Sequence, residues 1–285
     1  VWYPATEEFR DAPYDWIDLR ARAPEWARDS IPDVDIPPIE TNYVRDADLR
    51  KADGPYPLVV FSHGAYGVRF QSVFFTAYLA SHGYVVAAPD HPDNCLFDLF
   101  VQGGYSMEEI VNSSFDRPYD MTHLIDLMIE RNEKKHDFFE GVIDTEAIGV
   151  SGHSFGGYVS FVMALVDSRV KAILPMAPST LLLPPQGHFV EEITVPVMVM
   201  AGKLDKTIGD VEQEMELPYH QVPPPKYYFE LLTGGHYTFT DICVLDLEKA
   251  AHEMGISDAE DALTDGCADF NIPTDLAHPI IRQFG

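Results

Sequence analysis

Long apolar runs alternate with amphipathic stretches along the chain from residue 57 onward. Apolar runs of four to eight residues bounded by glycine or proline are typical of strands buried on both faces of a sheet. The sequence predicts six such strands: Pro57–Ser62, Gly83–Pro89, Ala147–Ser151, Val170–Met176, Val195–Ala201 and Lys226–Leu232.

Stretches with apolar residues at helical spacing separate these strands. The predicted helices are Phe70–Ser81, Tyr119–Glu133, Phe155–Val166, Asp241–His252 and Thr274–Phe284. Strands that alternate with helices indicate an α/β protein with a mostly parallel sheet covered on both faces. Asp90–Asp116 is expected to be a long excursion, and residues 91–117 are assigned as a lid or pocket segment.

The first 55 residues follow a different pattern, rich in proline and charge, and they contain all three tryptophans. We expect a short strand at Val1–Pro4, a helical or irregular segment at Trp16–Arg28 and a proline-rich linker at Ile31–Ile39. An α/β chain of 285 residues often forms one domain, so we expect a single domain over residues 1–285 with a divergent segment 1–55.

The charge is strongly negative, with 19 Lys and Arg against 46 Asp and Glu and a net charge of −27. Such a surface repels phosphate backbones and anionic lipid, which argues against a nucleic-acid partner. It fits either a highly soluble protein or one adapted to high salt, where counter-ions screen self-repulsion. No apolar run approaches the length of a membrane helix, so no integral membrane segment is expected.

Residue 1 is valine, and we expect a processed or trimmed chain whose targeting signal cannot be read. The three cysteines are Cys95, Cys243 and Cys267. They allow one disulfide with one free thiol, which would indicate an oxidising compartment, or three reduced thiols.

The segment Gly152–Gly157, with the sequence GHSFGG, lies between a predicted buried strand and an apolar helix. It matches G-x-S-x-G in the strand–turn–helix context of a nucleophile elbow, where small residues let strand and helix approach and the serine projects above the sheet. No lysine or phosphate-loop spacing accompanies it. Ser154 is therefore the predicted nucleophile.

A serine hydroxyl needs a base, and that base needs an orienting acid. In this architecture the chain order is serine, acid, histidine, with the last two on loops after later strands. Asp205 follows the fifth strand and is the predicted acid, with Asp210 as the alternative. His236 follows the sixth strand after two glycines and is the predicted base. The other late histidines, at positions 220, 252 and 278, lie at less suitable points of the chain.

An oxyanion needs two donors aimed at the developing charge. The N–H of Phe155, directly after the nucleophile, is one candidate. The N–H of Ala65, in the loop after the first core strand, is the other. His63 in the same loop is expected to bond within it.

Taken together, Pro57–Gly64, Gly152–Gly157, Asp205 and His236 resemble the α/β-hydrolase fold. The chain more narrowly resembles the bacterial dienelactone-hydrolase-like and platelet-activating-factor-acetylhydrolase-like esterases, which are relatives of polyester hydrolases. Four further stretches carry this resemblance: Trp2–Ala5, Phe61–Gly64, Ser81–Ala88 and Arg117-Pro118, the last expected to open a helix. The resemblance implies a serine carboxylic ester hydrolase that uses no cofactor or metal and acts on small or polymeric esters, expected as a monomer.

The C-terminal part, with Gly234–His236, Cys243 and Asp265–Cys267, resembles the ending of secreted members of this group. It implies a Cys243–Cys267 disulfide and a secreted or periplasmic location. The predicted pocket residues, on loops at the strand ends, are Tyr66, Met176, Cys95 and Phe97.

Two departures bear on specificity. Ser154 stands where dienelactone hydrolases have cysteine, which favours an esterase. Ala65 and the Met176 region replace the aromatic residues that cutinase-type polyester hydrolases carry, so polyester activity is left open. A peptidase, a phospholipase A2-type acetylhydrolase and a non-catalytic binding protein on the same fold are the competing interpretations.

Overall fold

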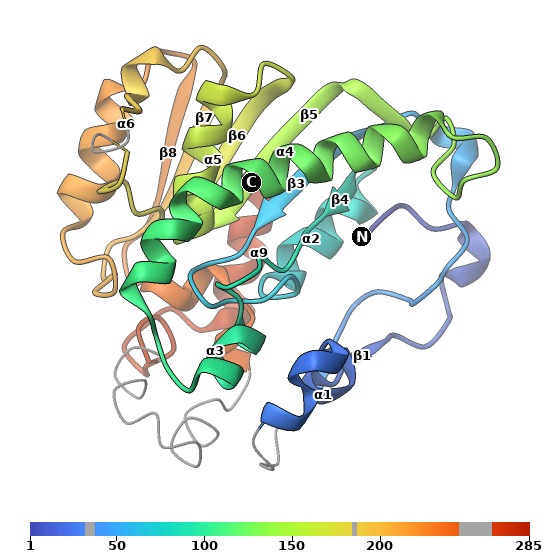
Figure 1. The fold of residues 1–285 in the computed structure, drawn as a ribbon, viewed down its shortest axis with the longest axis horizontal. Helices are drawn as coiled ribbons and strands as arrows, with labels where there is room; N and C mark the ends of the chain where they lie inside the picture. The colour runs from blue at the N-terminus through green and yellow to red at the C-terminus, as the bar shows by residue number, and fades with distance from the viewer. Residues whose placement is uncertain (32–37, 184–186, 245–263) are drawn as a thin grey trace.

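Six parallel strands form the central sheet in the order β4-β3-β5-β6-β7-β8 (Figure 1). The computed structural model describes residues 1–31, 38–183, 187–244 and 264–285. The strands are β3 Tyr56–Ser62, β4 Val85–Ala87, β5 Ile143–His153, β6 Val170–Met176, β7 Val197–Gly202 and β8 Lys226–Leu231. Each predicted strand overlaps one of them, so the predicted α/β class with a mostly parallel sheet is confirmed.

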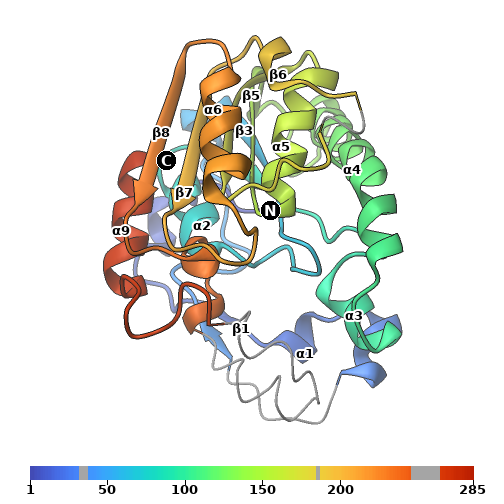
Figure 2. The same ribbon diagram turned by 90° about the vertical axis from the view of Figure 1, so that its left-hand side faces the viewer.

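Helices cover both faces of this sheet, with α4 and α5 on one face and α2 and α9 on the other (Figure 2). The helices are α1 Leu19–Arg22, α2 Val73–Ser81, α3 Leu96–Gln102, α4 Met107–Glu133, α5 Phe155–Val166, α6 Leu217–Gln221 and α9 Thr274–Phe284. A short antiparallel pair, β1 Trp16–Ile17 and β2 Ile39–Glu40, lies in the N-terminal segment. The core strands are buried along most of their length.

Helix α4 begins twelve residues before the start that the sequence predicted at Tyr119. Arg117 and Pro118 therefore lie inside a helix rather than opening one, and the excursion Asp90–Asp116 contains α3 and the first part of α4. Pro118 lacks the N–H that would bond to the carbonyl of Ser114. The hydroxyl of Tyr158 on α5 donates to that carbonyl instead, at 3.1 Å, which lets the helix continue.

The N-terminal segment is less regular than predicted. Trp2 makes a single bridge to Val86 rather than a strand over Val1–Pro4. The segment Trp16–Arg28 divides into β1, α1 and a 3₁₀ turn at Glu25–Ser30. Asp18 separates the first two pieces, and Ala23-Pro24 separates the last two. Most of the predicted linker Ile31–Ile39 lies outside the described residues.

A second hydrophobic cluster fixes this segment to the rest of the protein. It is separate from the core around the sheet. Its N-terminal members are Ile17, Ala23, Ala27 and Ile31, and they pack with Val68, Phe70, Val73, Ala77, Cys95 and Phe97. The segment therefore covers α2 and the start of α3.

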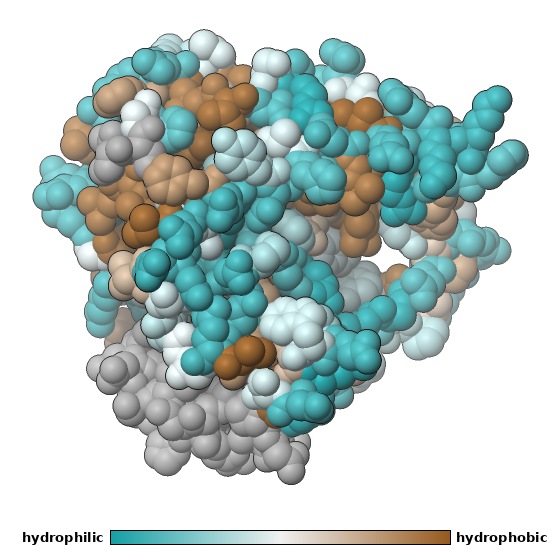
Figure 3. All heavy atoms as spheres, in the orientation of Figure 1, coloured by the Kyte–Doolittle hydropathy of each residue, from teal (hydrophilic) through white to brown (hydrophobic). Residues whose placement is uncertain are grey.

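Hydrophilic side chains follow α4 across one face of the molecule, with hydrophobic patches on either side (Figure 3). Within the described residues, no helix has the length and apolar character needed to cross a membrane.

The helix predicted over Asp241–His252 is a 3₁₀ turn at Ile242–Val244 where the structure describes it. The remainder of that segment lies outside the described residues.

The buried imidazole of His278 on α9 stays neutral in the folded protein until the pH falls to about 4. Its ring stacks on Phe74 with centroids 3.7 Å apart, and Nε2 donates to the carbonyl of Thr240 at 3.1 Å. Burial, with a smaller contribution from Arg282, lowers the pKa of His278 to about 4.

Replacing His278 with glutamine is expected to weaken the acid dependence of stability. An unfolded histidine binds a proton near its ordinary pKa of about 6.5. The folded residue does so only near its lowered pKa, so acidification between the two values favours the unfolded chain. Wild type should lose up to about 1.4 kcal/mol of unfolding free energy per pH unit more than His278→Gln in this window.

Urea unfolding followed by tryptophan fluorescence across this pH range measures the difference. The exposed residue His136 has φ +64°, which asparagine tolerates, so His136→Asn serves as the control and should keep the wild-type slope. Equal slopes for His278→Gln and wild type would contradict a neutral buried imidazole.

Candidate active site

Ser154 lies between β5 and α5 with φ +57° and ψ −117°, a conformation that an L-residue adopts only under strain. Its N–H donates to the carbonyl of Met176 at 2.8 Å, and its carbonyl accepts from Gly157 and Tyr158. Ser154 is partly exposed, whereas the residues on both sides of it are buried. This is the geometry of a nucleophile elbow.

Two glycines make this turn possible. A Cβ atom on Gly156 would lie 1.9 Å from the carbonyl oxygen of Ser62 in β3. A Cβ atom on Gly152 would lie 2.4 Å from the carbonyl oxygen of Gly156. Helix α5 can therefore start over the ends of β3 and β5 only because both positions lack a side chain.

His236 lies in the turn after β8, and Asp205 lies in the loop after β7. Nδ1 of His236 donates to Oδ2 of Asp205 at 2.7 Å, and both side chains are buried. The other carboxylate oxygen of Asp205 accepts the N–H groups of Thr207 and Ile208. Because Nδ1 holds the donated proton, Nε2 of a neutral His236 is free to accept one.

The structure brings His236 beside the residue that precedes Ser154. The ring centroids of His153 and His236 are 4.6 Å apart. The hydroxyl of Ser154 makes no hydrogen bond to the residues that the structure describes, so the Ser154–His236 contact stays a prediction. Such contacts are often loose before substrate binds.

The alternatives weighed from sequence occupy other positions. Asp210 is exposed and accepts the N–H groups of Glu212 and Gln213, as a helix cap does. His220 is exposed on α6, and His278 packs on Phe74. Position 252 lies outside the described residues.

The two predicted oxyanion donors remain available. Among the described residues, nothing accepts a hydrogen bond from the N–H of Ala65 or from that of Phe155. Ala65 is exposed, and Phe155 is the first residue of α5, where helix N–H groups have no partner within the helix.

The loop that carries Ala65 is fixed from behind by Arg117, which is fully buried. The guanidinium donates to the carbonyls of His63, Gly64 and Asn94, and it lies 4.5 Å above the ring of Phe155. Burial lowers the pKa of Arg117 to about 9. The sequence places Arg117 only at a predicted helix start, and nothing local in the sequence marks it as the support of this loop.

Two of the predicted pocket residues support the elbow and its surroundings. Met176 is fully buried at the end of β6, and its carbonyl accepts the N–H of Ser154. The hydroxyl of Tyr66 bonds to Ser106 and Glu109 at the start of α4. Tyr66 therefore ties the loop after β3 to α4, and its ring meets Tyr105 edge-on at 5.2 Å.

The other two, Cys95 and Phe97, are buried in the cluster that holds the N-terminal segment. They also line a cavity of about 480 Å³ together with Trp26 and His91, and this cavity contains none of the residues Ser154, Asp205 and His236. Burial raises the pKa of the Cys95 thiol to about 12, with Asp98 adding to the effect. The thiol is thus held in its protonated, unreactive form.

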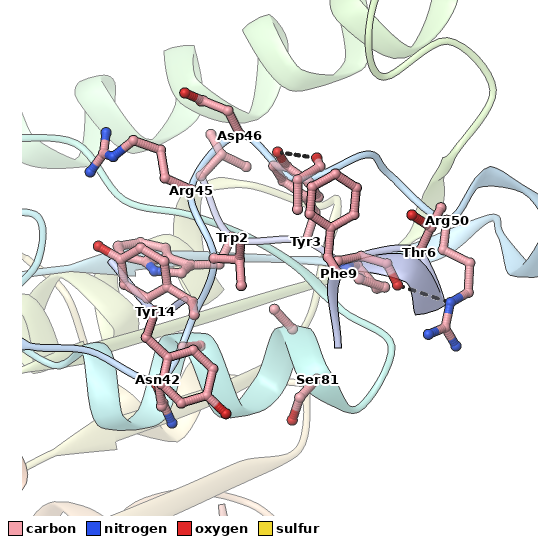
Figure 4. Close-up of a pocket in the computed structure, with 18 of the residues that line it drawn as sticks. Trp2, Tyr3, Thr6, Phe9, Tyr14, Asn42, Arg45, Asp46, Arg50 and Ser81 are labelled. Atoms are coloured by element: carbon pink, nitrogen blue, oxygen red, sulfur yellow. Dashed lines mark hydrogen bonds between the residues drawn. The ribbon is translucent and has the colours of Figure 1, made fainter. Parts of the chain in front are cut away.

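A larger cavity of about 950 Å³ lies between the N-terminal segment and the end of α2 (Figure 4). Aromatic rings of Trp2, Tyr3, Phe9 and Tyr14 line it with Arg45 and Arg50. It too contains no member of the predicted triad. Across the described residues, no group of three or more His, Cys, Asp or Glu side chains is arranged to hold a metal ion.

Asp265 is a buried carboxylate that the sequence marks only as part of the resemblance to secreted members, without a role in the site. Its Oδ2 accepts from the N–H of Lys206 and from the N–H and hydroxyl of Thr207, all at 2.8 Å. Its Oδ1 accepts the N–H of His236 at 3.2 Å. One side chain thus joins the loop of the predicted acid to the loop of the predicted base. Its place in the sequence, directly before Gly266, gave no signal of this role.

A disulfide between Cys243 and Cys267 lies close to this carboxylate in the chain, and Cys95 is a free, buried thiol. The bond links the segment after His236 to the segment that carries Asp265. It therefore restrains the two backbone segments that meet at the imidazole.

Replacing Gly156 with alanine is expected to prevent the close approach of α5 to β3. The added methyl group would overlap the Ser62 carbonyl, which is backbone and cannot move aside. We expect a loss above about 4 kcal/mol in unfolding free energy, or failure to fold. Gly149→Ala in β5, the strand that leads into this turn, is the control, because its Cβ would meet neighbours at 3.7 Å and 3.8 Å. Comparable stability for the two variants would contradict the steric argument.

Replacing Asp265 with asparagine is expected to break the link to His236. An amide keeps one acceptor oxygen for the three donors of the 206–207 loop, so its NH₂ group faces the N–H of His236. The expected cost is about 1–3 kcal/mol in unfolding free energy, measured with urea. Asp210→Asn should cost far less, since asparagine caps helices as well as aspartate does. Equal costs would argue against a joining role for Asp265.

Three known proteins illustrate what the chain is similar to. Chlorophyllase type 0 from Chenopodium album is 29% identical over 147 residues, covering 51% of this chain and 39% of its own length. Cutinase est1 from Thermobifida alba is 25% identical over 193 residues, covering 66% and 55%. Platelet-activating factor acetylhydrolase from Bos taurus is 27% identical over 163 residues, covering 44% and 35%. The chain spans roughly a third to a half of the length of these relatives.

A solved ferulic acid esterase from Streptomyces cinnamoneus matches the fold with a TM-score of 0.60 at 22% identity, covering 83% of this chain and 67% of that one. This likeness confirms the α/β-hydrolase fold. A family model described as PET hydrolase-like matches residues 51–251, which include Ser154, Asp205 and His236. That range is more than half of the chain, and it agrees with the resemblance to polyester-hydrolase relatives seen in the motifs. The chain therefore belongs to the PET hydrolase-like family.

Proposed function

We propose that the protein is a serine hydrolase of carboxylic esters, with Ser154 as nucleophile, His236 as base and Asp205 as the orienting acid. The 2.7 Å bond between His236 Nδ1 and Asp205, together with a strained serine at a strand–helix turn, carries this proposal. Family membership and relatives named as a cutinase and a chlorophyllase support ester chemistry.

In this mechanism Ser154 Oγ attacks the ester carbonyl while His236 Nε2 takes its proton. Asp205 stabilises the imidazolium that forms, because its carboxylate accepts the hydrogen bond of the Nδ1–H group throughout. The imidazolium then protonates the leaving alcohol, and an acyl group remains on Ser154. Water, activated by the same imidazole, releases the acid and restores the serine.

The N–H groups of Ala65 and Phe155 would bind the oxyanion of the tetrahedral intermediate. Both are without an acceptor in the described residues, and Phe155 adds the positive end of the α5 dipole. No cofactor is needed for these steps.

Polyester substrates are our first proposal for the natural substrate class. The description of the matching family and the relative named as a cutinase support it. The match to platelet-activating factor acetylhydrolase favours a second candidate, short-chain acyl lipids.

The Cys243–Cys267 disulfide supports a location outside the reducing cytoplasm, because disulfides persist in oxidising compartments.

Purified protein should hydrolyse short p-nitrophenyl esters, and Ser154→Ala should lower kcat by at least about 10³-fold. The serine loses its oxygen but the fold keeps its packing, so thermal unfolding should remain near that of wild type. A fluorophosphonate probe should label wild type at Ser154 and leave the variant unlabelled. A variant that retains full turnover would refute the assignment of the nucleophile.

The same preparation then separates the candidate substrates. Release of soluble acid from a solid polyester film supports a polyester hydrolase, whereas hydrolysis confined to short-chain acyl phospholipid supports the second candidate. Absence of turnover on all esters and of probe labelling would favour a non-catalytic binding protein.

A further inference from the structure

Gln71 and His153 form a buried polar link that the proposed mechanism does not use. Gln71 lies just before α2, and His153 is the last residue of β5; both are almost fully buried. The amide of Gln71 lies between the loop that carries Ala65 and the ring of His153. His153 in turn contacts the main chain of His236.

The chemistry of each partner fixes the direction of every bond in this link. The N–H of Gly64 can only donate, so it is Oε1 of Gln71 that faces it, at 3.2 Å. Nε2 of Gln71 then donates to Nδ1 of His153 at 2.9 Å. Nε2 of His153 must carry the proton, because the carbonyl of His236 at 2.9 Å can only accept.

His153 remains neutral in this arrangement. Burial holds the pKa of His153 well below its ordinary value, and the nearby His236 lowers it further. A second proton on Nδ1 would also meet the NH₂ group of Gln71. His153 therefore does not compete with His236 for the proton that leaves the serine, although the two rings lie 4.6 Å apart.

The main chain around Gln71 holds the far side of the His236 loop. The carbonyl of Gln71 accepts the N–H of Asp241 at 2.8 Å. The hydroxyl of Ser72 donates to the carbonyl of Phe239 at 3.0 Å. The segment 71–72 therefore contacts the oxyanion loop, the nucleophile strand and the base loop within two residues of sequence.

We propose that Gln71 and His153 are positioning residues that set the distance between the oxyanion donors and the imidazole of His236. The series of hydrogen bonds Gly64–Gln71–His153–His236 joins the loop after β3 to the loop after β8 across the end of β5, directly before Ser154. This inference rests on the proposed function, since it concerns the relative placement of that function's reacting groups.

Substitutions that imitate one ring nitrogen at a time test the link. His153→Asn places an oxygen near the Nδ1 position and keeps the bond to Gln71, but it loses the donor to His236. His153→Gln places an NH₂ group near the Nε2 position and keeps that donor. Gln71→Met fills the volume without polar atoms. His136→Asn and Gln283→Leu, both at exposed sites, are the matched controls.

We expect Gln71→Met and His153→Asn to lower kcat on p-nitrophenyl acetate by about 10- to 100-fold with little change in KM, as displacement of a catalytic group does. His153→Gln should retain more activity than His153→Asn. The double variant Gln71→Met/His153→Asn should be no worse than about twofold below the poorer single variant, because both break the same chain. Thermal unfolding of each variant shows whether a loss of activity comes from misplaced catalytic groups in a folded protein or from unfolding of the protein.

A readout independent of turnover uses nitrogen-15 and carbon-13 NMR of labelled protein. In wild type, His153 should keep its proton on Nε2 and stay neutral even at about pH 6.5, where an ordinary histidine is half protonated. In Gln71→Met, the Nδ1 signal of His153 and the carbonyl signal of His236 should both shift. The spectrum of His153→Asn identifies the ring signals by their loss.

Unchanged His236 signals in Gln71→Met, multiplicative losses in the double variant, or single variants within twofold of wild type would each overturn the positioning role. A wild-type protein without esterase activity would instead refute the proposed function. In that event the NMR comparison still decides whether the link transmits position from Gln71 to His236.

Discussion

The contact between the start of α5 and the end of β3 governs the rest of the site. A carbonyl oxygen of Ser62 occupies the space that any side chain on Gly156 would need, and Gly152 is crowded in the same way. This approach forces Ser154 into its positive φ and leaves the first N–H of α5 without an acceptor among the described residues. The backbone strain at Ser154 and the unpaired N–H of Phe155 therefore arise from one steric constraint. The apolar packing of α5 against the sheet offsets the cost of that strain.

The remaining groups come from strands that are neighbours in the sheet but distant in sequence. The loops after β7 and β8 meet because these strands pair in register, and Asp265 then joins the two loops through one carboxylate. Gln71 and His153 add a second link, which joins the loop after β3 to the main chain of His236. The imidazole is thus fixed by its carboxylate partner, by its own main chain and by a disulfide nearby.

The elements that sequence predicted well are those whose local pattern decides the structure. Helices Phe155–Val166 and Thr274–Phe284 and strand Val170–Met176 have the predicted bounds, since apolar periodicity alone specifies them. The predicted start of α4 was wrong because a proline commonly ends or begins a helix, whereas here the hydroxyl of Tyr158, 40 residues after Pro118, pairs with the carbonyl that the proline leaves free. The candidates Asp205 and His236 could be chosen from strand order. Asp265, Gln71 and Arg117 could not, because their partners, which are mainly backbone groups, are brought close only by the fold.

Arg117 has a consequence for the electrostatics of the site. Three donors, from Arg117, His63 and Gly67, point at the carbonyl of Gly64. In a trans peptide unit the carbonyl and the next N–H point in opposite directions, so fixing this oxygen also fixes the N–H of Ala65 on the far side. A cation buried behind the loop thereby presets a dipole whose positive end faces outward before any ligand arrives. Little reorientation of the peptide is then left to accompany the growth of negative charge.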